Sequence, residues 1–261
     1  MKIMVLLKKT PDTETKLVLD GEAINTNSVK FIINPYDEFA IEEALQIKSK
    51  VENGEVIVAS FGDDGVKELL IKALAMGADR AIQVSNEGLE GIDSLQTAKI
   101  LAALSKKENP DMILTGKQGI DDDNMHVQTM TAELLQWPHV NVIGKLTLEG
   151  TTAICEREVE GGQVEISKLT LPAVIGCNKS LNTPRYASLP GIMKAKRKPY
   201  QKLNVSDLGL DAAQLAQDSK VVVTGYLYPP EKPQGKIFQG EEVPQMIQKV
   251  VKLLREEAKV I

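Results

Sequence analysis

The sequence contains few of the residues from which most metal and catalytic sites are built. Among 261 residues there are only two cysteines and two histidines. Cys155 and Cys177 supply neither a metal-ligand set nor a disulfide framework, and such sparse cysteine fits a reducing compartment, so we expect a cytoplasmic protein. His126 and His139 have no ligand spacing around them, and no nucleophile motif or phosphate loop is present. We therefore expect no metal site and no catalytic residues of the chain's own.

Long apolar runs and an excess of positive charge are also missing. The formal net charge is −5 and the pI is near 5.3, which argues against general binding to the nucleic-acid backbone. The apolar run at residues 3–7 is too short for a signal peptide, and no segment approaches the roughly 20 residues of a membrane span. We expect a soluble protein without membrane insertion, which does not bind nucleic acid.

Strand and helix patterns alternate through the first half of the chain. Asn34-Pro35 opens one helix, and Asp63 or Asp64 caps a second helix that ends at Gly77. Apolar strands are expected at residues 2–7, 56–60, 81–84 and 112–115, and a further helix at 94–106. This alternation predicts an α/β fold with a mostly parallel, doubly wound sheet, helices on both faces, and ligands at the carboxyl ends of the strands.

The pattern changes after Trp137-Pro138. Residues 140–176 are typical of successive β segments with Gly161-Gly162 as a hairpin turn. From residue 185 onwards apolar patterning is too sparse for an independent domain, so we expect a core at 1–184 and a partner-wrapping arm at 185–261, with an extended crossing at 228–233. The arm ends in an amphipathic helix whose apolar face must cover this chain or a partner: Val243, Ile247, Val250, Val251 and Leu254.

Residues 115–135, TGKQGIDDDNMHVQTMTAELL, combine features that conflict. A glycine-containing turn between a strand and a helix is a usual phosphate site, because backbone N–H groups and the helix dipole converge there. Asp121, Asp122 and Asp123 occupy the same turn. Either these acids only overcap the start of the helix, or the turn binds a nucleotide through its amides.

Three segments together resemble the beta subunit of electron transfer flavoproteins, from end to end. They are INPYDEFAIEEAL (33–45), ALAMGADRAIQV (73–84) with GKQGIDDD (116–123), and REVEGGQVEISKLTLPAVIGC (157–177) leading into LNTPRYASLPGIMKAKRK (181–198). The resemblance implies an adenine-nucleotide alpha-hydrolase-like core and an obligate heterodimer whose alpha subunit holds the redox FAD. It also implies that this subunit is scaffold, AMP binder and docking surface for acyl-CoA dehydrogenases of fatty acid oxidation, whose electrons pass towards the respiratory chain.

The same resemblance assigns individual residues. One acid would cap the helix, Asp122 would accept from a ribose hydroxyl, and the phosphate would rest on amides near residues 124–127. The expected AMP contacts are Leu7, Asn34, Phe61, Gly116, Asp122, Met125, His126 and Val127. Tyr36 would pack near the flavin ring held by the partner subunit.

A docking loop is expected in the last of the three segments. Its residues are Tyr186, Leu189, Pro190, Ile192, Met193 and Lys194. Leu189 would anchor in a pocket of the dehydrogenase while the basic run at 194–198 raises the association rate. The alternative is a solvated charge run beside one buried leucine.

Two other functions stand beside this one. Many AMP-binding members have Asn-Gln-Thr where this chain has Met125-His126-Val127, which leaves open a bifurcating beta subunit that holds a second FAD and oxidises NADH; Val127 fits the turn of the bifurcating members. Their turn has glycine where Asp122 lies, and a side chain there would crowd a pyrophosphate, which favours AMP. A homodimeric nucleotide sensor of the universal-stress type is the alternative from another class, although the β-rich middle and long arm favour a large partner.

Overall fold

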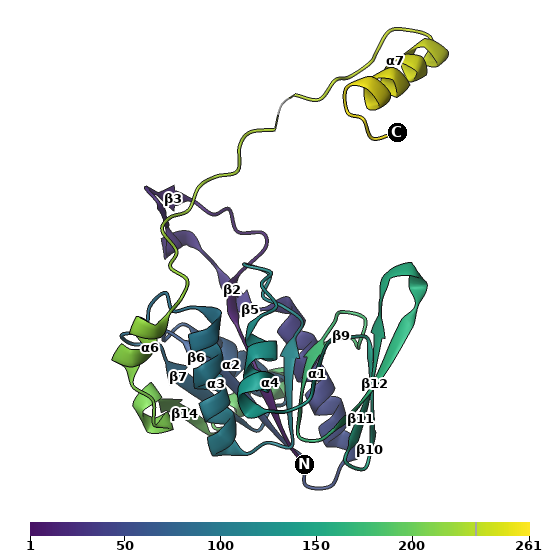
Figure 1. Cartoon of the computed structure of the whole chain (residues 1–261). Coiled ribbons are helices and arrows are strands. Elements are labelled where there is room, and N and C mark those ends of the chain that lie inside the picture. The colour runs from purple at the N-terminus through teal and green to yellow at the C-terminus, as the bar shows by residue number, and fades with distance from the viewer. Residues whose placement is uncertain (233) are drawn as a thin grey trace. The chain divides into compact units, whose positions relative to one another are not determined.

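The computed structural model describes residues 1–232 and 234–261, with the side chain of Ser28 outside that set. The chain divides into two compact units, Met1–Gly225 and Tyr226–Ile261. The first unit contains a seven-stranded sheet with helices on both faces (Figure 1). The predicted α/β fold is therefore confirmed.

All seven strands of the central sheet are parallel. The chain runs outward from β1 to β6 and β7, and then returns to β8 on the other side of β1. The strands, in spatial order, are β14 (Tyr200–Leu203), β7 (Arg80–Ser85), β6 (Glu55–Gly62), β1 (Lys2–Leu6), β8 (Met112–Gly116), β13 (Ala173–Cys177) and β9 (His139–Ile143). The strand order thus reverses beside β1, and in open α/β sheets ligands bind at this point.

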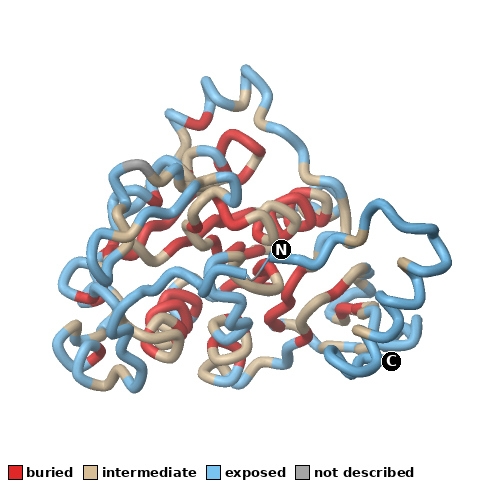
Figure 2. The backbone as a smooth tube through the Cα atoms, turned by 90° about the horizontal axis from the view of Figure 1, so that it is seen from above, coloured by how far each residue is buried: buried red, intermediate tan, exposed pale blue. Residues whose placement is uncertain are grey.

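Alternate residues of the inner strands belong to two separate hydrophobic cores. In β1, Ile3 and Val5 join one core while Met4 and Leu6 join the other, because successive side chains point to opposite faces. The first core is covered by α1 (Pro35–Lys50), α2 (Val66–Met76) and α5 (Leu189–Ala195). The second is covered by α3 (Ser94–Glu108), α4 (Val127–Leu135) and α6 (Ala212–Asp218). Figure 2 shows the buried residues gathered in the strands and the inner faces of these helices.

The helix starts follow the sequence with one difference. Asn34 is the N-cap of α1 with Pro35 in its first turn, and Gly77 ends α2, both as predicted. The N-cap of α2 is Gly65 rather than Asp63 or Asp64. The carboxylate of Asp63 accepts from the N–H of Gly65 at 2.9 Å, so it stabilises the turn before the helix instead of the helix itself.

The β-rich middle forms a second, antiparallel sheet. It consists of β10 (Lys145–Glu149), β11 (Thr152–Glu158) and β12 (Val164–Thr170). Gly161 and Gly162 both have a φ of 74°, and with the short η2 (Glu160–Gly162) they make the predicted hairpin turn. Smaller pairs also occur: β2 (Lys9–Pro11) with β5 (Phe31–Ile33), and β3 (Leu19–Asp20) with β4 (Ala23–Ile24), followed by η1 (Thr26–Ser28).

The boundary between the core and the arm lies further along the chain than the expected position at residue 185. β14 pairs with β7 at the edge of the sheet, and Leu203, Val205 of η3 (Val205–Leu208) and Leu215 are buried in the second core. Residues 185–225 therefore cluster with the core, and the second unit begins at Tyr226. Few apolar residues suffice because they pair with an existing sheet edge and extend an existing core instead of building a core of their own.

The second unit consists of irregular chain and the helix α7 (Val243–Glu256). Its amphipathic character is as predicted, and the five apolar residues of its face are all at least 37% exposed. Pro233, which belongs to the expected crossing at 228–233, lies outside the described residues. Within the described ranges, no helix has the length and apolar character needed to cross a membrane.

Candidate functional site

A pocket of about 380 Å³ lies at the carboxyl ends of β1, β6 and β8, beside the point where the strand order reverses. The starts of α2, α3 and α4 complete its wall. All eight residues expected to contact a nucleotide line this one pocket: Leu7, Asn34, Phe61, Gly116, Asp122, Met125, His126 and Val127. Parallel strands bring these residues together although they span 120 positions of sequence.

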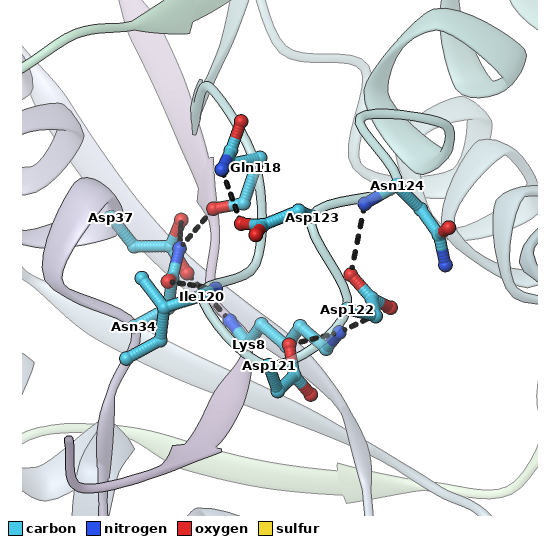
Figure 3. Close-up of polar contacts among 9 residues, drawn as sticks. All are labelled: Lys8, Asn34, Asp37, Gln118, Ile120, Asp121, Asp122, Asp123 and Asn124. Atoms are coloured by element: carbon cyan, nitrogen blue, oxygen red, sulfur yellow. Dashed lines mark hydrogen bonds and ion pairs between the residues drawn. The ribbon is translucent and has the colours of Figure 1, made fainter. Parts of the chain in front are cut away.

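Asn34 joins the start of α1 to the loop that follows β8 (Figure 3). Its Nδ2 donates to the carbonyl of Gln118 at 2.8 Å and to Oδ1 of Asp37 at 2.9 Å. Its Oδ1 accepts from the N–H of Ile120 at 3.2 Å. The buried amide therefore fixes the loop in front of the sheet and makes no cap of its own helix.

Asp37, the third residue of α1, also lines the pocket. Its Oδ2 accepts from the backbone N–H of Lys8 at 2.7 Å, and its Oδ1 accepts from the N–H of Gly116 at 2.9 Å. Burial raises the pKa of this carboxyl to about 7, against the opposing effect of its hydrogen bonds and of the Lys8 charge. Gly116 is required here because a Cβ would lie 2.4 Å from Oδ1 of Asp37 and 2.6 Å from the Cβ of Tyr36.

Lys8 neutralises part of the acidic turn. Its Nζ lies 2.7 Å from Oδ1 of Asp121 and 2.8 Å from Oδ2 of Asp122 (Figure 3). Burial alone would lower the pKa of Lys8, but the hydrogen bonds and charges of the two acids raise it. Burial would likewise raise the pKa of Asp122, but the bond from Lys8 lowers it. Asp121 and Asp122 are therefore paired with the ammonium group of Lys8, which lies just after β1.

None of the three acids caps α4, so the expectation of an acidic cap is wrong. The N-cap residue is His126, which makes no side-chain cap bond. Asp122 accepts from the N–H of Asn124 at 3.2 Å, and Asp123 accepts from the side chain of Gln118. The helix begins only at Val127, too far along the chain for these carboxylates to reach its first amides.

The backbone between the acids and α4 alternates in handedness. Asp123 has a φ of 52° and Met125 a φ of 56°, whereas Asn124 between them does not have a positive φ. Such alternation is typical of anion-binding concavities. The N–H of Asp123 already donates to the carbonyl of Gly119 at 3.0 Å and that of Asn124 to Asp122, so the later amides face less competition. The first N–H groups of an α-helix also lack intrahelical acceptors, and α4 has no acid in its first turn. An anion can therefore bind here through backbone amides.

The rest of the pocket wall is mainly apolar. Leu7, Phe61, Ile92 and Val127 contribute large side chains, and Phe61 is half-buried. Thr115 also lines the pocket, and its buried Oγ1 has no hydrogen-bond partner among the described residues. The site thus combines a surface for a flat apolar group, one unpaired hydroxyl, and amides for an anion.

A family model described as "Electron transfer flavoprotein domain" matches residues 22–208 of the chain. The chain is 42% identical over 262 residues to the electron transfer flavoprotein subunit beta of Bacillus subtilis, with both chains covered completely. The chain belongs to the electron transfer flavoprotein beta-subunit family. It is also 41% identical to the Mus musculus subunit and 40% identical to the Homo sapiens subunit, each over 239 residues that cover 90% of this chain and 91% of the relative.

Membership in the electron transfer flavoprotein family makes the chain a component of an electron carrier that associates with flavin. It contradicts the alternative of a universal-stress-type sensor. Family membership alone does not say what the pocket binds or which proteins contact the exposed surfaces of this chain.

Sequence reasoning missed several polar residues of the electron transfer flavoprotein pocket. Among them are Lys8, Asp37 and Gln128, and Nε2 of Gln128 donates to the carbonyl of Lys117 at 2.7 Å. Asn141 donates to the same carbonyl at 3.1 Å and so helps to hold the loop after β8. A position directly after a buried strand was a usable indication for Lys8, whereas Asp37 resembles an ordinary acid in the first turn of a helix.

Tyr36 lies outside the pocket lining, at the second position of α1. Its side chain is half-buried, and Nζ of Lys117 lies 4.8 Å from the centre of its ring. Its expected place near the flavin of an electron transfer flavoprotein stays a prediction.

The six expected docking residues are all exposed, on α5 and the chain just before it. Tyr186 is 97% exposed, Leu189 is 79% exposed and Met193 is 75% exposed. The alternative of one buried leucine is therefore wrong. α5 starts after Ser188, whose Oγ accepts from the N–H of Gly191 at 3.2 Å.

The segment around α5 is anchored firmly although its outer side chains are free of the core. Nζ of Lys198 donates to the carbonyl of Leu74 at 2.9 Å, at the carboxyl end of α2. Arg185 forms a two-pronged ion pair with Glu42 of α1, at 2.7 and 2.9 Å. The exposed apolar residues are thus presented on a fixed platform.

Proposed function

We propose that this chain pairs with an electron transfer flavoprotein alpha subunit and binds AMP in the pocket, while the alpha subunit holds the redox FAD. The observation that carries the proposal is the gathering of all eight expected contact residues around one pocket with an amide-lined end. In this proposal the chain is scaffold and nucleotide holder and has no catalytic residues of its own.

The pocket's chemistry supports a mononucleotide. Leu7 and Phe61 would pack against the adenine, and the turn that runs from Asn124 to Val127 would hold the phosphate. The N–H of Asn124 already donates to Asp122, so the amides of the residues that follow would provide most of the hydrogen bonds to the phosphate. Asp122 has a second role available, since a carboxylate can accept from a ribose hydroxyl.

Charge pairing around the pocket explains why the amides matter. Lys8 is paired with two acids, and Lys9 is paired with Asp63 at 2.6 Å. A phosphate therefore meets basic side chains that are already engaged, and oriented backbone dipoles supply the remaining attraction.

The same features favour AMP over a second FAD. Asp122 lines the pocket and is held there by its ion pair with Lys8, so a pyrophosphate would have to displace that pair. A volume of about 380 Å³ also lies near the small end of ligand pockets, which span roughly 300 to 1,000 Å³. An electron-bifurcating beta subunit that oxidises NADH remains the second candidate.

Identification of the released nucleotide tests the proposal. The alpha–beta complex is purified, denatured and analysed by liquid chromatography with mass spectrometry. We expect AMP and one FAD per heterodimer. Two FAD molecules per heterodimer would establish the bifurcating alternative, and one FAD without AMP would contradict the assignment of the pocket.

We further propose that α5 and its preceding loop dock acyl-CoA dehydrogenases, whose electrons pass through the flavoprotein towards the respiratory chain. Tyr186, Leu189, Pro190, Ile192, Met193 and Lys194 form this docking surface. An exposed apolar anchor supplies affinity, and Lys196 and Arg197 beside it are exposed and raise the rate of encounter with an acidic partner.

The arm completes the proposed assembly. The apolar face of α7 is exposed in the chain by itself, and burial against the alpha subunit would remove this liability and make the heterodimer obligate. A cytoplasmic location fits the two cysteines, which are both free and buried.

A further inference from the structure

Asp37 connects the two strands between which the strand order reverses. One carboxylate oxygen accepts from the N–H of Lys8 just after β1, at 2.7 Å, and the other accepts from the N–H of Gly116 at the end of β8, at 2.9 Å. Asn34 donates to the same carboxylate at 2.9 Å. Only 4% of Asp37 is exposed, so water does not compete for these bonds.

Both strand ends that Asp37 holds lead directly to the acidic turn. Asp37 holds the backbone of Lys8, and the side chain of the same residue pairs with Asp121 and Asp122. Gly116 begins the loop whose carbonyl at Gln118 is fixed by Asn34. A shift of either strand end would therefore move the turn relative to the apolar wall of the pocket.

We propose that Asp37 is a positioning residue for nucleotide binding, which acts by fixing Lys8 and the turn at residues 116–126 against α1. The inference rests on the proposed function, in which AMP occupies this pocket. It extends that function because Asp37 itself needs no contact with the nucleotide.

The clamp needs an ionised carboxylate. Three N–H donors point at its two oxygens, and a protonated oxygen would present an O–H to one of them instead of a lone pair. Burial raises the pKa of Asp37 to about 7, so the clamp forms fully only above neutral pH.

The other groups around Asp37 are identified element by element. Lys8 follows β1, and its pKa is raised by its acidic partners, so it keeps its charge. Cys177 ends β13, and burial together with the charges of Glu43 and Asp37 raises its thiol pKa well above the ordinary value, so it stays neutral.

The other charged groups near Asp37 are engaged with partners of their own. Glu38 on α1 is paired with Lys72 at 2.7 Å, and Lys117 after β8 lies over the ring of Tyr36. β5 and β6 also pack on α1, and they contribute Ile33 and Val58 to its core.

AMP binding to the purified full chain, freed of nucleotide, tests the inference by calorimetry at pH 6 and pH 8. If only the ionised carboxylate supports binding, a pKa of about 7 predicts affinity about tenfold weaker at pH 6 than at pH 8. Asp37→Asn places an N–H group against a donor and should weaken binding at pH 8 by at least about tenfold. It should also remove the extra pH dependence and leave only the dependence that the phosphate itself contributes.

Glu38→Gln is the matched control, since it removes the next carboxylate of the same helix, which lies outside the pocket. It should keep both the affinity and the pH profile of the parent chain. Asp37→Asn that binds AMP with the parent's affinity and pH profile would overturn the inference. Failure of the folded parent and of Glu38→Gln to bind AMP at either pH would instead remove the proposed function.

If Asp37→Asn does not fold, the affinity of the parent chain for adenosine at the two pH values tests the inference without a variant. Adenosine has no phosphate, so the ligand itself does not titrate in this range. Its affinity for the parent chain should fall by about tenfold from pH 8 to pH 6 if the clamp controls the pocket. A flat profile with adenosine would overturn the inference.

Discussion

Lys8 and Asp122 form an ion pair of 2.8 Å although 114 positions separate them in sequence. The pair joins the end of the first strand to the acidic turn and so closes one side of the pocket. Asp121 shares the same ammonium group at 2.7 Å. One cation thus offsets two carboxylates at the place where a phosphate is proposed to bind.

Replacement of Lys8 should weaken AMP binding. In Lys8→Met, Asp121 and Asp122 lose their counter-charge and repel the phosphate, so we expect affinity lower by about tenfold, or about 1.4 kcal/mol. Lys30→Met removes a comparable 2.7 Å ion pair with Asp12 outside the pocket lining and serves as the control. Titration calorimetry with AMP measures both, and equal affinities would contradict this role of Lys8.

Leu189→Ala should impair docking but not cofactor binding. Leu189 is 79% exposed, so its loss leaves the core intact while it removes the proposed anchor. We expect kcat/KM for flavin reduction by an acyl-CoA dehydrogenase to fall at least about tenfold. Ile166→Ala, on β12, removes another apolar side chain, which is 62% exposed, and should have no such effect. A parallel loss of flavin in Leu189→Ala would contradict the docking role.

Deletion of residues 236–261 should abolish the heterodimer. The segment contains the apolar face of α7, whose burial contributes up to about 1.5 to 3 kcal/mol for each large side chain before entropic costs. Size-exclusion chromatography of the coexpressed subunits, with the FAD content of each peak, measures the outcome. A truncated chain that still pairs with alpha and keeps stoichiometric FAD would show that the arm does not hold the complex.

Point substitutions in α7 sharpen the same test. Val250→Asp places a charge on the apolar face, whereas Lys252→Asp changes a side chain that is 70% exposed and pairs only loosely with Glu256 at 3.9 Å. We expect the first to dissociate the heterodimer and the second to leave it intact. Equal behaviour of the two variants would mean that this face is not at the interface.

The pH dependence of stability provides a separate test of the buried carboxyl. The folded-state pKa of Asp37 is about 7 and its ordinary value is 3.8. Between these values the folded state holds a proton that the unfolded state has released, so the contribution of Asp37 to stability falls as pH rises through this window. The total change is on the order of 4 kcal/mol for a shift of this size.

Denaturant unfolding at pH 5 and pH 8 measures the part of that change that lies above pH 5, on the order of 3 kcal/mol. Asn does not titrate, so Asp37→Asn should gain stability relative to the parent as the pH rises. Glu38→Gln supplies the comparison, because its carboxylate is paired at the surface of the same helix. A constant difference between the parent and Asp37→Asn at both pH values would show that Asp37 does not titrate in this window.

Local patterns predicted the elements that depend on neighbouring residues. The start of α1 at Asn34-Pro35, the end of α2 at Gly77 and the hairpin at Gly161-Gly162 all follow from the conformational limits of proline and glycine. The rule that ligands bind at the carboxyl ends of parallel strands predicted the edge of the sheet at which the pocket lies, whereas its individual residues came from the resemblance to the family.

Features set by distant pairing could not be predicted in this way. β14 has the sequence YQKL, which lacks an apolar run, and it is a strand because the edge of β7 is free to pair with it. The pairing of Lys8 with the acidic turn also depends on the fold, since either group alone resembles a solvated surface charge. One of the acids was therefore expected to cap the helix, because the first amides of the helix were the nearest partners along the chain.

Helix α2 separates the two surfaces for which functions are proposed. Val66 at its first turn lines the pocket, while Leu74 near its other end accepts from Lys198 beneath the docking segment. Eleven residues of α-helix span about 16 Å. Because backbone carbonyls and the Arg185–Glu42 pair hold the proposed docking segment, its outward side chains can be exchanged by grafting while the pocket keeps its shape.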